Sequence, residues 1–105
     1  MQTSKEWLDV ARVEDFPPGS MRSVTMDGRD VVVFHVDGSF HALLDCCTHD
    51  GGDLSSGTLA GAEIICPRHE ARFDVRTGMV RAPPAYEDVP VVEVRVCHDR
   101  VQLKR

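Results

Sequence analysis

Two short motifs in the middle of the sequence contain the side chains best suited to chemistry. The first is a C-x-H motif formed by Cys47 and His49, and the second is a C-x-x-H motif formed by Cys66 and His69. Each motif offers one thiolate and one imidazole, and both groups bind first-row transition metals. Sixteen residues lie between His49 and Cys66, which is enough for two tight loops to face each other. The spacing therefore predicts a metal centre built by two loops.

Cys46 lies directly beside the first motif and offers a second thiol to the same centre. The C-x-H register favours Cys47 as the ligand, because only Cys47 stands one residue away from His49. We expect the remaining histidines and the last cysteine to be packed or solvated side chains without metal-binding roles. These residues are His35, His41, His98 and Cys97.

The sequence on either side of the motifs predicts an all-β protein. Apolar and polar residues alternate in several short segments, which is the period of a half-buried strand. Asp27-Gly28 and Asp37-Gly38 separate three of these segments, and Asp-Gly is typical of tight hairpin turns because glycine readily adopts positive φ. We expect a small antiparallel β-barrel or sandwich. Its expected strands are residues 6–13, 20–26, 29–36, 39–44, 92–97 and 101–103.

The stretch from about residue 45 to 84 differs from its flanks. It is rich in Gly, Asp, Ser, Cys and His, and its only apolar pieces are residues 62–65 and 73–75. No amphipathic helical pattern is present here or elsewhere in the sequence. A loop-rich insertion of this length must be organised by something besides hydrophobic packing. We expect a metal-binding subdomain inserted into a single domain that spans residues 1–105.

Length and charge exclude several other classes of protein. A chain of 105 residues forms one domain, without room for a large enclosed catalytic chamber. Its net charge of −5 offers no basic excess for a nucleic-acid backbone. The longest apolar runs, 31–34 and 89–92, are far shorter than the ~20 residues of a membrane span, and no signal-peptide pattern begins the chain. We expect a cytoplasmic protein, where reduced cysteines favour metal or redox chemistry over disulfides.

With these motifs in place, the chain resembles the Rieske iron–sulfur proteins, and most of all the small stand-alone Rieske-type ferredoxins of multicomponent oxygenases. The likeness includes both metal motifs and their spacing, then Arg72-Phe73-Asp74, Thr77-Gly78 and Pro83-Pro84. It implies one [2Fe–2S] cluster, because family members bind one iron through two Cys and the other through two His. Carried over to this sequence, Cys47 and Cys66 bind one iron, and His49 and His69 bind the other.

The resemblance also implies a function. Such a protein is an electron carrier rather than an enzyme, and passes single electrons from a flavin-dependent NAD(P)H reductase to a terminal non-haem iron oxygenase. Docking is expected to be transient, at the end of the molecule that carries the histidines, and the protein is expected to be a monomer. Two alternatives remain. One is a small Rieske-type subunit of nitrite reductase or another reductase; the other is a zinc-stabilised interaction module, since two Cys and two His also suit Zn²⁺.

Four positions of the sequence indicate whether the proposed cluster has a high or a low reduction potential. High-potential respiratory relatives have a disulfide between the two loops, and the matching positions in this sequence are Gly52 and Arg68. They also have a Ser and a Tyr hydroxyl that point at the cluster sulfurs, where this sequence has Ala71 and Phe73. Hydrogen bonds to sulfur stabilise the electron-rich reduced state, so their loss lowers the potential. We therefore expect a low-potential carrier.

Three further features follow from the same resemblance. Glu70 stands where the family commonly has glycine, so a positive φ there strains the backbone. Pro83-Pro84 is either a third loop that shields the cluster or an ordinary turn. Glu87 and Asp88 are expected to form a solvated face rather than a docking patch.

Overall fold

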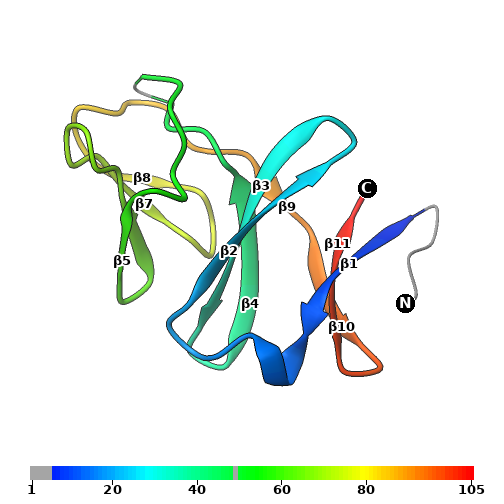
Figure 1. Ribbon diagram of the computed structural model, residues 1–105. Helices are drawn as coiled ribbons and strands as arrows, with labels where there is room; N and C mark the ends of the chain where they lie inside the picture. The colour runs from blue at the N-terminus through cyan, green and yellow to red at the C-terminus, as the bar shows by residue number, and fades with distance from the viewer. Residues whose placement is uncertain (1–5, 49) are drawn as a thin grey trace.

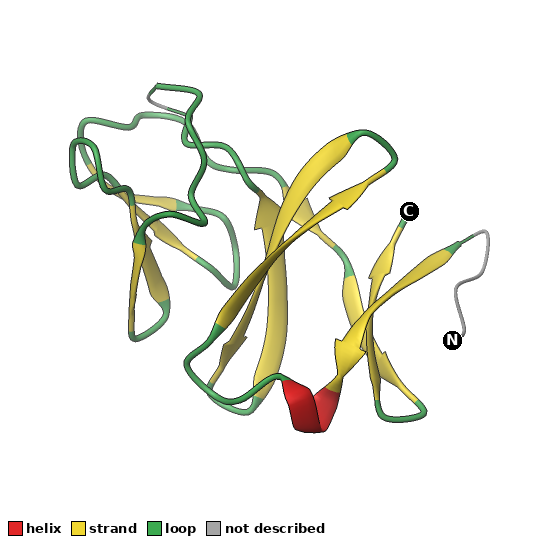
Figure 2. Cartoon of the chain, viewed as in Figure 1, coloured by secondary structure: helices red, strands yellow, loops and turns green. Residues whose placement is uncertain are grey.

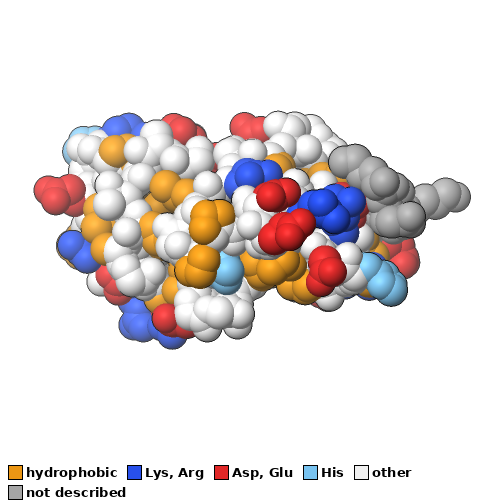
Figure 3. Space-filling model, turned by 60° about the horizontal axis from the view of Figure 1, so that its bottom comes forward, with side chains coloured by type: hydrophobic (Ala, Val, Ile, Leu, Met, Phe, Trp, Pro, Cys, Tyr) orange, Lys and Arg blue, Asp and Glu red, His pale blue; other side chains and the backbone are white. Residues whose placement is uncertain are grey.

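The computed structural model describes residues 6–48 and 50–105 as three antiparallel sheets that lie side by side along an elongated molecule of 40 × 27 × 19 Å (Figures 1 and 3). One turn of 3-10 helix, Val13–Asp15, follows the first strand, and the described residues contain no helix long and apolar enough to cross a membrane. The expected all-β architecture is confirmed. The strands are β1 (Trp7–Arg12), β2 (Met21–Met26), β3 (Arg29–Val36), β4 (Ser39–Leu44), β5 (Thr58–Ala60), β6 (Glu63–Ile65), β7 (Arg72–Asp74), β8 (Val80–Ala82), β9 (Val91–Val92), β10 (Val94–Cys97) and β11 (Arg100–Lys104).

The central strand β3 connects the two hydrophobic cores. Its run of four apolar residues, Val31–Phe34, is fully buried, because alternate side chains enter different cores. The first and third side chains belong to the core that contains Leu103 of β11. The second and fourth belong to the core that contains Phe73 of β7. A strand covered on both faces needs no polar alternation, which accounts for the uninterrupted run.

The Asp-Gly turns form the hairpins that the sequence predicts. Asp27-Gly28 joins β2 to β3 with φ values of 52° and 79°, and Asp37-Gly38 joins β3 to β4 with 52° and 77°. Two positive φ values in a two-residue loop are the geometry that matches strand twist. His98-Asp99, between β10 and β11, adopts the same geometry without a glycine, at 50° and 63°.

The segment expected as a single strand at residues 92–97 is divided between two sheets, so that expectation is wrong in this detail. β9 pairs with β4 in the order β2-β3-β4-β9, whereas β10 pairs with β11 in the order β1-β11-β10. The change occurs at Glu93, which lies between the two strands. A strand that leaves one sheet for another turns the corner of a sandwich, and here it joins the outer sheet to the central one.

The loop-rich segment is an insertion between two neighbouring strands of the central sheet. The chain leaves this sheet after Leu44 and re-enters it at Val91, which pairs with Leu43. Between them lies the third sheet, in the order β5-β6-β7-β8, with long loops gathered at one end (Figure 2). The apolar pieces at 62–65 and 73–75 correspond to β6 and β7. The sequence did not predict β5 or β8.

The Thr77-Gly78 turn fastens this third sheet to the returning chain. Asp74, only 3% exposed, accepts hydrogen bonds from the backbone N–H and the guanidinium of Arg76, and Arg81 lies 3.5 Å away. The hydrogen bond from Arg76 is the main reason that the pKa of Asp74 falls to about 2. Gly78 has a φ of 76°, and a Cβ at this position would collide with the carbonyl oxygen of Val89. The carbonyl of Gly78 accepts a hydrogen bond from the N–H of Val89. Glycine is therefore required at this close approach.

Candidate metal centre

The first loop is shaped by Asp45, which follows β4 and precedes the cysteines. Its Oδ1 accepts the backbone N–H groups of Leu54 and Ser55 at 2.6 and 2.8 Å, and its Oδ2 accepts the Ser23 hydroxyl at 3.1 Å. One carboxylate thus joins both ends of the loop to the central sheet. Backbone bonds between Cys47 and the 51–52 segment, both 2.7 Å, tighten the loop further. Asp45 was not singled out from the sequence, because its partners lie nine, ten and twenty-two positions away.

The second loop is a tight turn that follows β6. The N–H of Cys66 donates to Ala71 at 2.8 Å, and the N–H of Glu70 donates back to Cys66 at 3.0 Å. This closure buries Cys66 completely and leaves the side chain of His69 59% exposed. Glu70 has a φ of 62°, so the positive φ expected from the family resemblance is present. The turn therefore separates an inward thiol from an outward imidazole.

The two loops bring the predicted thiols together. Cys47 and Cys66 are both fully buried and free of disulfides, and their Sγ atoms and a carboxylate oxygen of Asp50 all lie within 4.8 Å of one another. Cys46 is exposed, and its thiol faces the carbonyl of Cys47 at 3.9 Å. The buried thiol pair therefore consists of Cys47 and Cys66.

Among the described residues, the imidazole of His69 does not converge with these thiols. His69 Nδ1 lies 4.0 Å from Asp50 Oδ2, and His69 is not part of the converging group found among the described residues. His49 lies outside the described residues. A single zinc ion would require all four donors to converge on one point, whereas a centre of two irons divides them. The position of His69, apart from the converging thiols, fits ligands divided between two irons better than ligands that converge on a single zinc ion.

The segment around Pro83-Pro84 is joined to the first loop. The Thr48 hydroxyl donates to the carbonyl of Glu87 at 2.6 Å, across 39 positions of sequence. Glu87 and Asp88 are both exposed, as expected for a solvated face, and the Asp88 carboxylate also accepts the N–H of Val80 at 2.9 Å. Tyr86, which directly precedes Glu87, is 87% exposed. These contacts favour a third loop of the site over an isolated turn.

Two buried residues next to the second loop have side chains that cannot donate a hydrogen bond. Ala71 and Phe73 are fully buried and have no hydroxyl. Both belong to the same core as Cys47 and Cys66. The thiols are therefore enclosed by apolar groups on this side, and hydrogen bonds to them must come from elsewhere.

The other histidines and Cys97 lie away from the thiol pair. The His35 ring stacks on Phe40 with centroids 4.2 Å apart, and its Nδ1 is 2.7 Å from the carbonyl of Phe16. His41 is half-buried, and burial is the main cause of its lowered pKa. His98 is exposed in a turn and Cys97 is half-buried in β10. Their interpretation as packed or solvated side chains is confirmed for the described structure.

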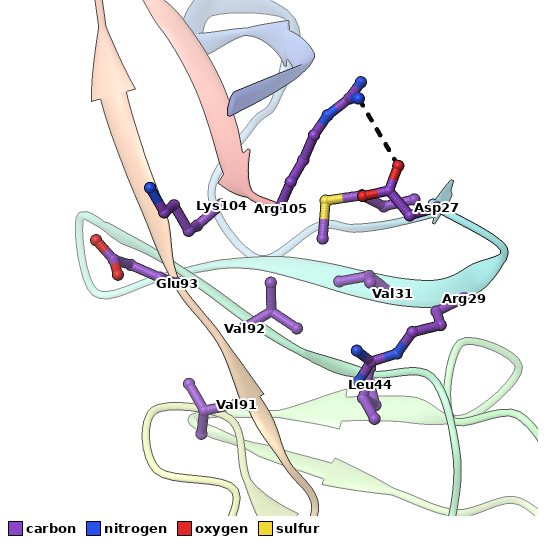
Figure 4. Close-up of a pocket in the computed structure, with 10 residues that line it drawn as sticks. Asp27, Arg29, Val31, Leu44, Val91, Val92, Glu93, Lys104 and Arg105 are labelled. Atoms are coloured by element: carbon purple, nitrogen blue, oxygen red, sulfur yellow. Dashed lines mark ion pairs between the residues drawn. The ribbon is translucent and has the colours of Figure 1, made fainter. Parts of the chain in front are cut away.

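A groove of about 220 Å³ lies beside the C-terminal strand, away from the thiols (Figure 4). Val31, Leu44 and Val92 contribute apolar surface, and an ion pair between Asp27 and Arg105, at 3.7 Å, spans one side. No cysteine or histidine lines it. The groove therefore has no part in the metal centre.

Comparisons with known proteins agree with this geometry. The family model described as "Rieske [2Fe-2S] domain" matches residues 6–93. A ferredoxin component of naphthalene 1,2-dioxygenase/salicylate 5-hydroxylase systems from Ralstonia sp. is 36% identical, over 96% of this chain and 97% of its own length.

Solved structures give the same result. One of them is described as a complex of reduced oxygenase and oxidized ferredoxin in carbazole 1,9a-dioxygenase. Its matching chain is 37% identical, with a TM-score of 0.91, and the match covers 96% of this chain and 94% of that chain. A structure described as an NADH-dependent nitrite reductase small subunit from Mycobacterium tuberculosis is 26% identical, with a TM-score of 0.81, and covers 94% of both chains.

Replacement of Glu70 by glycine is expected to stabilise the protein. The residue has a positive φ, which costs a side chain with a Cβ about 1 kcal/mol relative to glycine. The Glu70→Gly variant should therefore unfold at a higher temperature than Glu70→Ala, which keeps the strain but removes the carboxylate. Thermal unfolding followed by circular dichroism measures the difference. Equal midpoints for the two variants would show that the backbone is relaxed at this position.

Proposed function

This chain belongs to the Rieske [2Fe-2S] domain family, and we propose that it is the ferredoxin component of a ring-hydroxylating dioxygenase system. In this role it receives single electrons from a flavin-dependent NAD(P)H reductase and passes them to a terminal non-haem iron oxygenase. The observation that carries the proposal is the buried pair of thiols of Cys47 and Cys66, which form no disulfide, in a chain matched almost end to end by ferredoxin components. An electron carrier of this kind catalyses no reaction by itself.

The cofactor of a Rieske domain is one [2Fe–2S] cluster, and the residues of this chain fit it. Two thiols that are buried, close together and not disulfide-bonded are a suitable donor pair for one iron. We propose that Cys47 and Cys66 hold that iron, and that His49 and His69 hold the other. When bound, the cluster accepts and releases one electron at a time. The family match thereby favours a cluster over the zinc alternative.

The protein residues determine which side of the site a partner reaches. The thiols of Cys47 and Cys66 are fully buried, whereas the side chain of His69 is 59% exposed. Because the probability of electron transfer falls with distance, we propose that partners dock over this imidazole. The interface is expected to be transient and to bury less than ~1,200 Å², as is usual for redox encounters. The complex of a related ferredoxin with its oxygenase supports a partner of this kind.

We further propose that residues 1–105 form a single Rieske domain, with residues of about 45–84 as its cluster-binding subdomain. The insertion of the third sheet between β4 and β9 supports this division. We also propose a monomer that works in the cytoplasm, where reducing conditions keep the thiols of Cys47 and Cys66 available for metal binding.

A second candidate function is a small Rieske-type subunit of a nitrite reductase. The match to the Mycobacterium tuberculosis structure supports it, although its identity of 26% is lower than the 36–37% of the dioxygenase relatives. In both functions the same metal centre carries electrons, but the protein that receives them differs. They are distinguished by which partner oxidises the reduced protein.

The proposed function predicts rapid reoxidation by an oxygenase. The protein is reduced anaerobically, mixed with an oxidised ring-hydroxylating terminal oxygenase, and followed by its visible absorption. We expect one electron per chain to be transferred, at a rate that rises with oxygenase concentration. A parallel mixture with the large subunit of an NADH-dependent nitrite reductase is the control. Reoxidation in that mixture alone would replace the proposed function by the second candidate.

The buried positions 71 and 73 predict a low reduction potential. Rieske centres span about −150 to +300 mV, and we expect this protein near the lower limit because neither side chain donates a hydrogen bond. Ala71→Ser should raise the midpoint potential, since a hydroxyl near sulfur stabilises the reduced state. Ala42→Ser, at a fully buried position in the other core, should leave it unchanged. A wild-type midpoint well above zero, or a lower one in Ala71→Ser, would contradict this assignment; protein-film voltammetry measures both.

A further inference from the structure

The Arg68 side chain crosses from the second loop to the first. Its Nε donates to Asp50 Oδ2 at 2.5 Å, and its Nη2 donates to the backbone carbonyl of Asp53 at 2.9 Å. Its Nη1 lies 3.6 Å from the carboxylate of Asp53. All three guanidinium nitrogens therefore contact the first loop, fifteen to eighteen positions earlier in the sequence. A planar guanidinium can make such divided contacts, whereas a single ammonium group cannot.

The first loop is shaped to receive this guanidinium. A Cβ at Gly52 would lie 2.5 Å from Cζ of Arg68 and 2.7 Å from Nη2, so glycine leaves the room that the side chain fills. The N–H of Gly52 donates to Asp50 Oδ1 at 2.9 Å, which orients the carboxylate before Arg68 reaches its other oxygen. The side chains of Arg68 and Asp50 are 33% and 20% exposed, so water screens this pair less than a pair on the open surface. Both members of the ion pair are therefore held in place.

The ion pair also lies beside the proposed ligands. The Asp50 carboxylate belongs to the converging group with the thiols of Cys47 and Cys66, and the oxygen that Arg68 contacts is 4.0 Å from His69 Nδ1. Arg68 therefore places a positive charge next to a carboxylate that lies close to two metal-binding thiols.

We propose that Arg68 is a positioning residue that fastens the second cluster-binding loop to the first, and that its cation compensates the negative charge collected between them. The inference rests on the proposed function, because the two loops need a fixed separation only if they hold a cluster between them. The fastening works through Asp50 and the Asp53 carbonyl, without any covalent bond between the loops. Arg68 thereby limits the loop opening through which the metal would be lost.

The test compares the holoproteins of the wild type, Arg68→Leu, Arg68→Lys and Arg72→Leu. Arg72 is the matched control, because it pairs with Glu63 at 3.4 Å between neighbouring strands and does not connect the loops. Each protein is mixed anaerobically with an excess of an iron chelator, and the loss of visible absorption is followed. Arg68→Leu should lose its cluster about fivefold faster than the wild type, as for a partly buried charged hydrogen bond. Arg68→Lys should be intermediate, and Arg72→Leu should match the wild type.

The midpoint potential separates this role from a general loss of stability. Arg68→Leu should have a lower potential than the wild type, because a cation near the thiolates favours the added electron. Arg68→Lys keeps the positive charge, so its midpoint potential should lie close to that of the wild type. In a double-mutant cycle, Asp50→Asn should add little to the rate of cluster loss once Arg68 is leucine. Full additivity of the two substitutions would show that the residues act separately.

The outcomes distinguish this inference from the function on which it rests. A wild-type protein without iron and sulfide would overturn both. A cluster-containing wild type, with Arg68→Leu losing its cluster at the same rate, would overturn the role of Arg68 alone. If Arg68→Leu fails to assemble a cluster while Arg72→Leu assembles one fully, the role is supported, and Arg68→Lys then supplies the graded measurement.

Discussion

The burial of two thiols side by side, without a disulfide between them, is the constraint on which the rest of this structure depends. Cys47 and Cys66 come from different loops, yet both belong to the apolar core that extends from Phe34 of β3 to Phe73 of β7. As thiolates they would place two like charges in a low-dielectric site, which is unfavourable without a bound cation. Metal binding removes that conflict, so the folded loops and the bound cluster stabilise each other.

Polar contacts hold the loops in addition to hydrophobic packing, in which Leu54 of the first loop and Ala85 of the third are buried in the same core as the thiols. The Asp45 carboxylate gathers the ends of the first loop, the Thr48 hydroxyl joins it to the 83–90 segment, and Arg68 joins it to the second loop. Each contact fixes one boundary of the site while the β-sheets provide a rigid base. The result is an asymmetric centre, with its thiols inside and the imidazole of His69 at the surface. Such an asymmetry suits a protein that must protect a cluster yet exchange electrons with a partner.

The sequence predicts the parts of this protein whose signals are local. The limits of β3 and β4, and the Asp-Gly turns between the strands, agree with the structure because periodicity and turn residues act over a few positions. β5 and β8 have only three residues each and depend on pairing within the third sheet, so their local pattern is too short to identify. The division of residues 91–97 between two sheets is likewise decided by tertiary contacts.

The same distinction holds for the site. Motif spacing predicts the thiol pair, and the structure places Cys47 and Cys66 together. The roles of Asp45, Asp50 and Asp88 could not be predicted, because each depends on a hydrogen bond or ion pair to a residue eight to eighteen positions away. An aspartate in a loop carries no sequence signal for such a partner.

The most direct test of the account is iron and acid-labile sulfide analysis, combined with electron paramagnetic resonance of the reduced protein, on the wild type, Cys46→Ala and Cys47→Ala. The account predicts two irons and two sulfides per chain with mixed nitrogen and sulfur ligation. Cys46→Ala should retain this signature, and Cys47→Ala should lose it. A wild type that contains zinc without sulfide, or a cluster that survives in Cys47→Ala and is lost in Cys46→Ala, would contradict the central assignment.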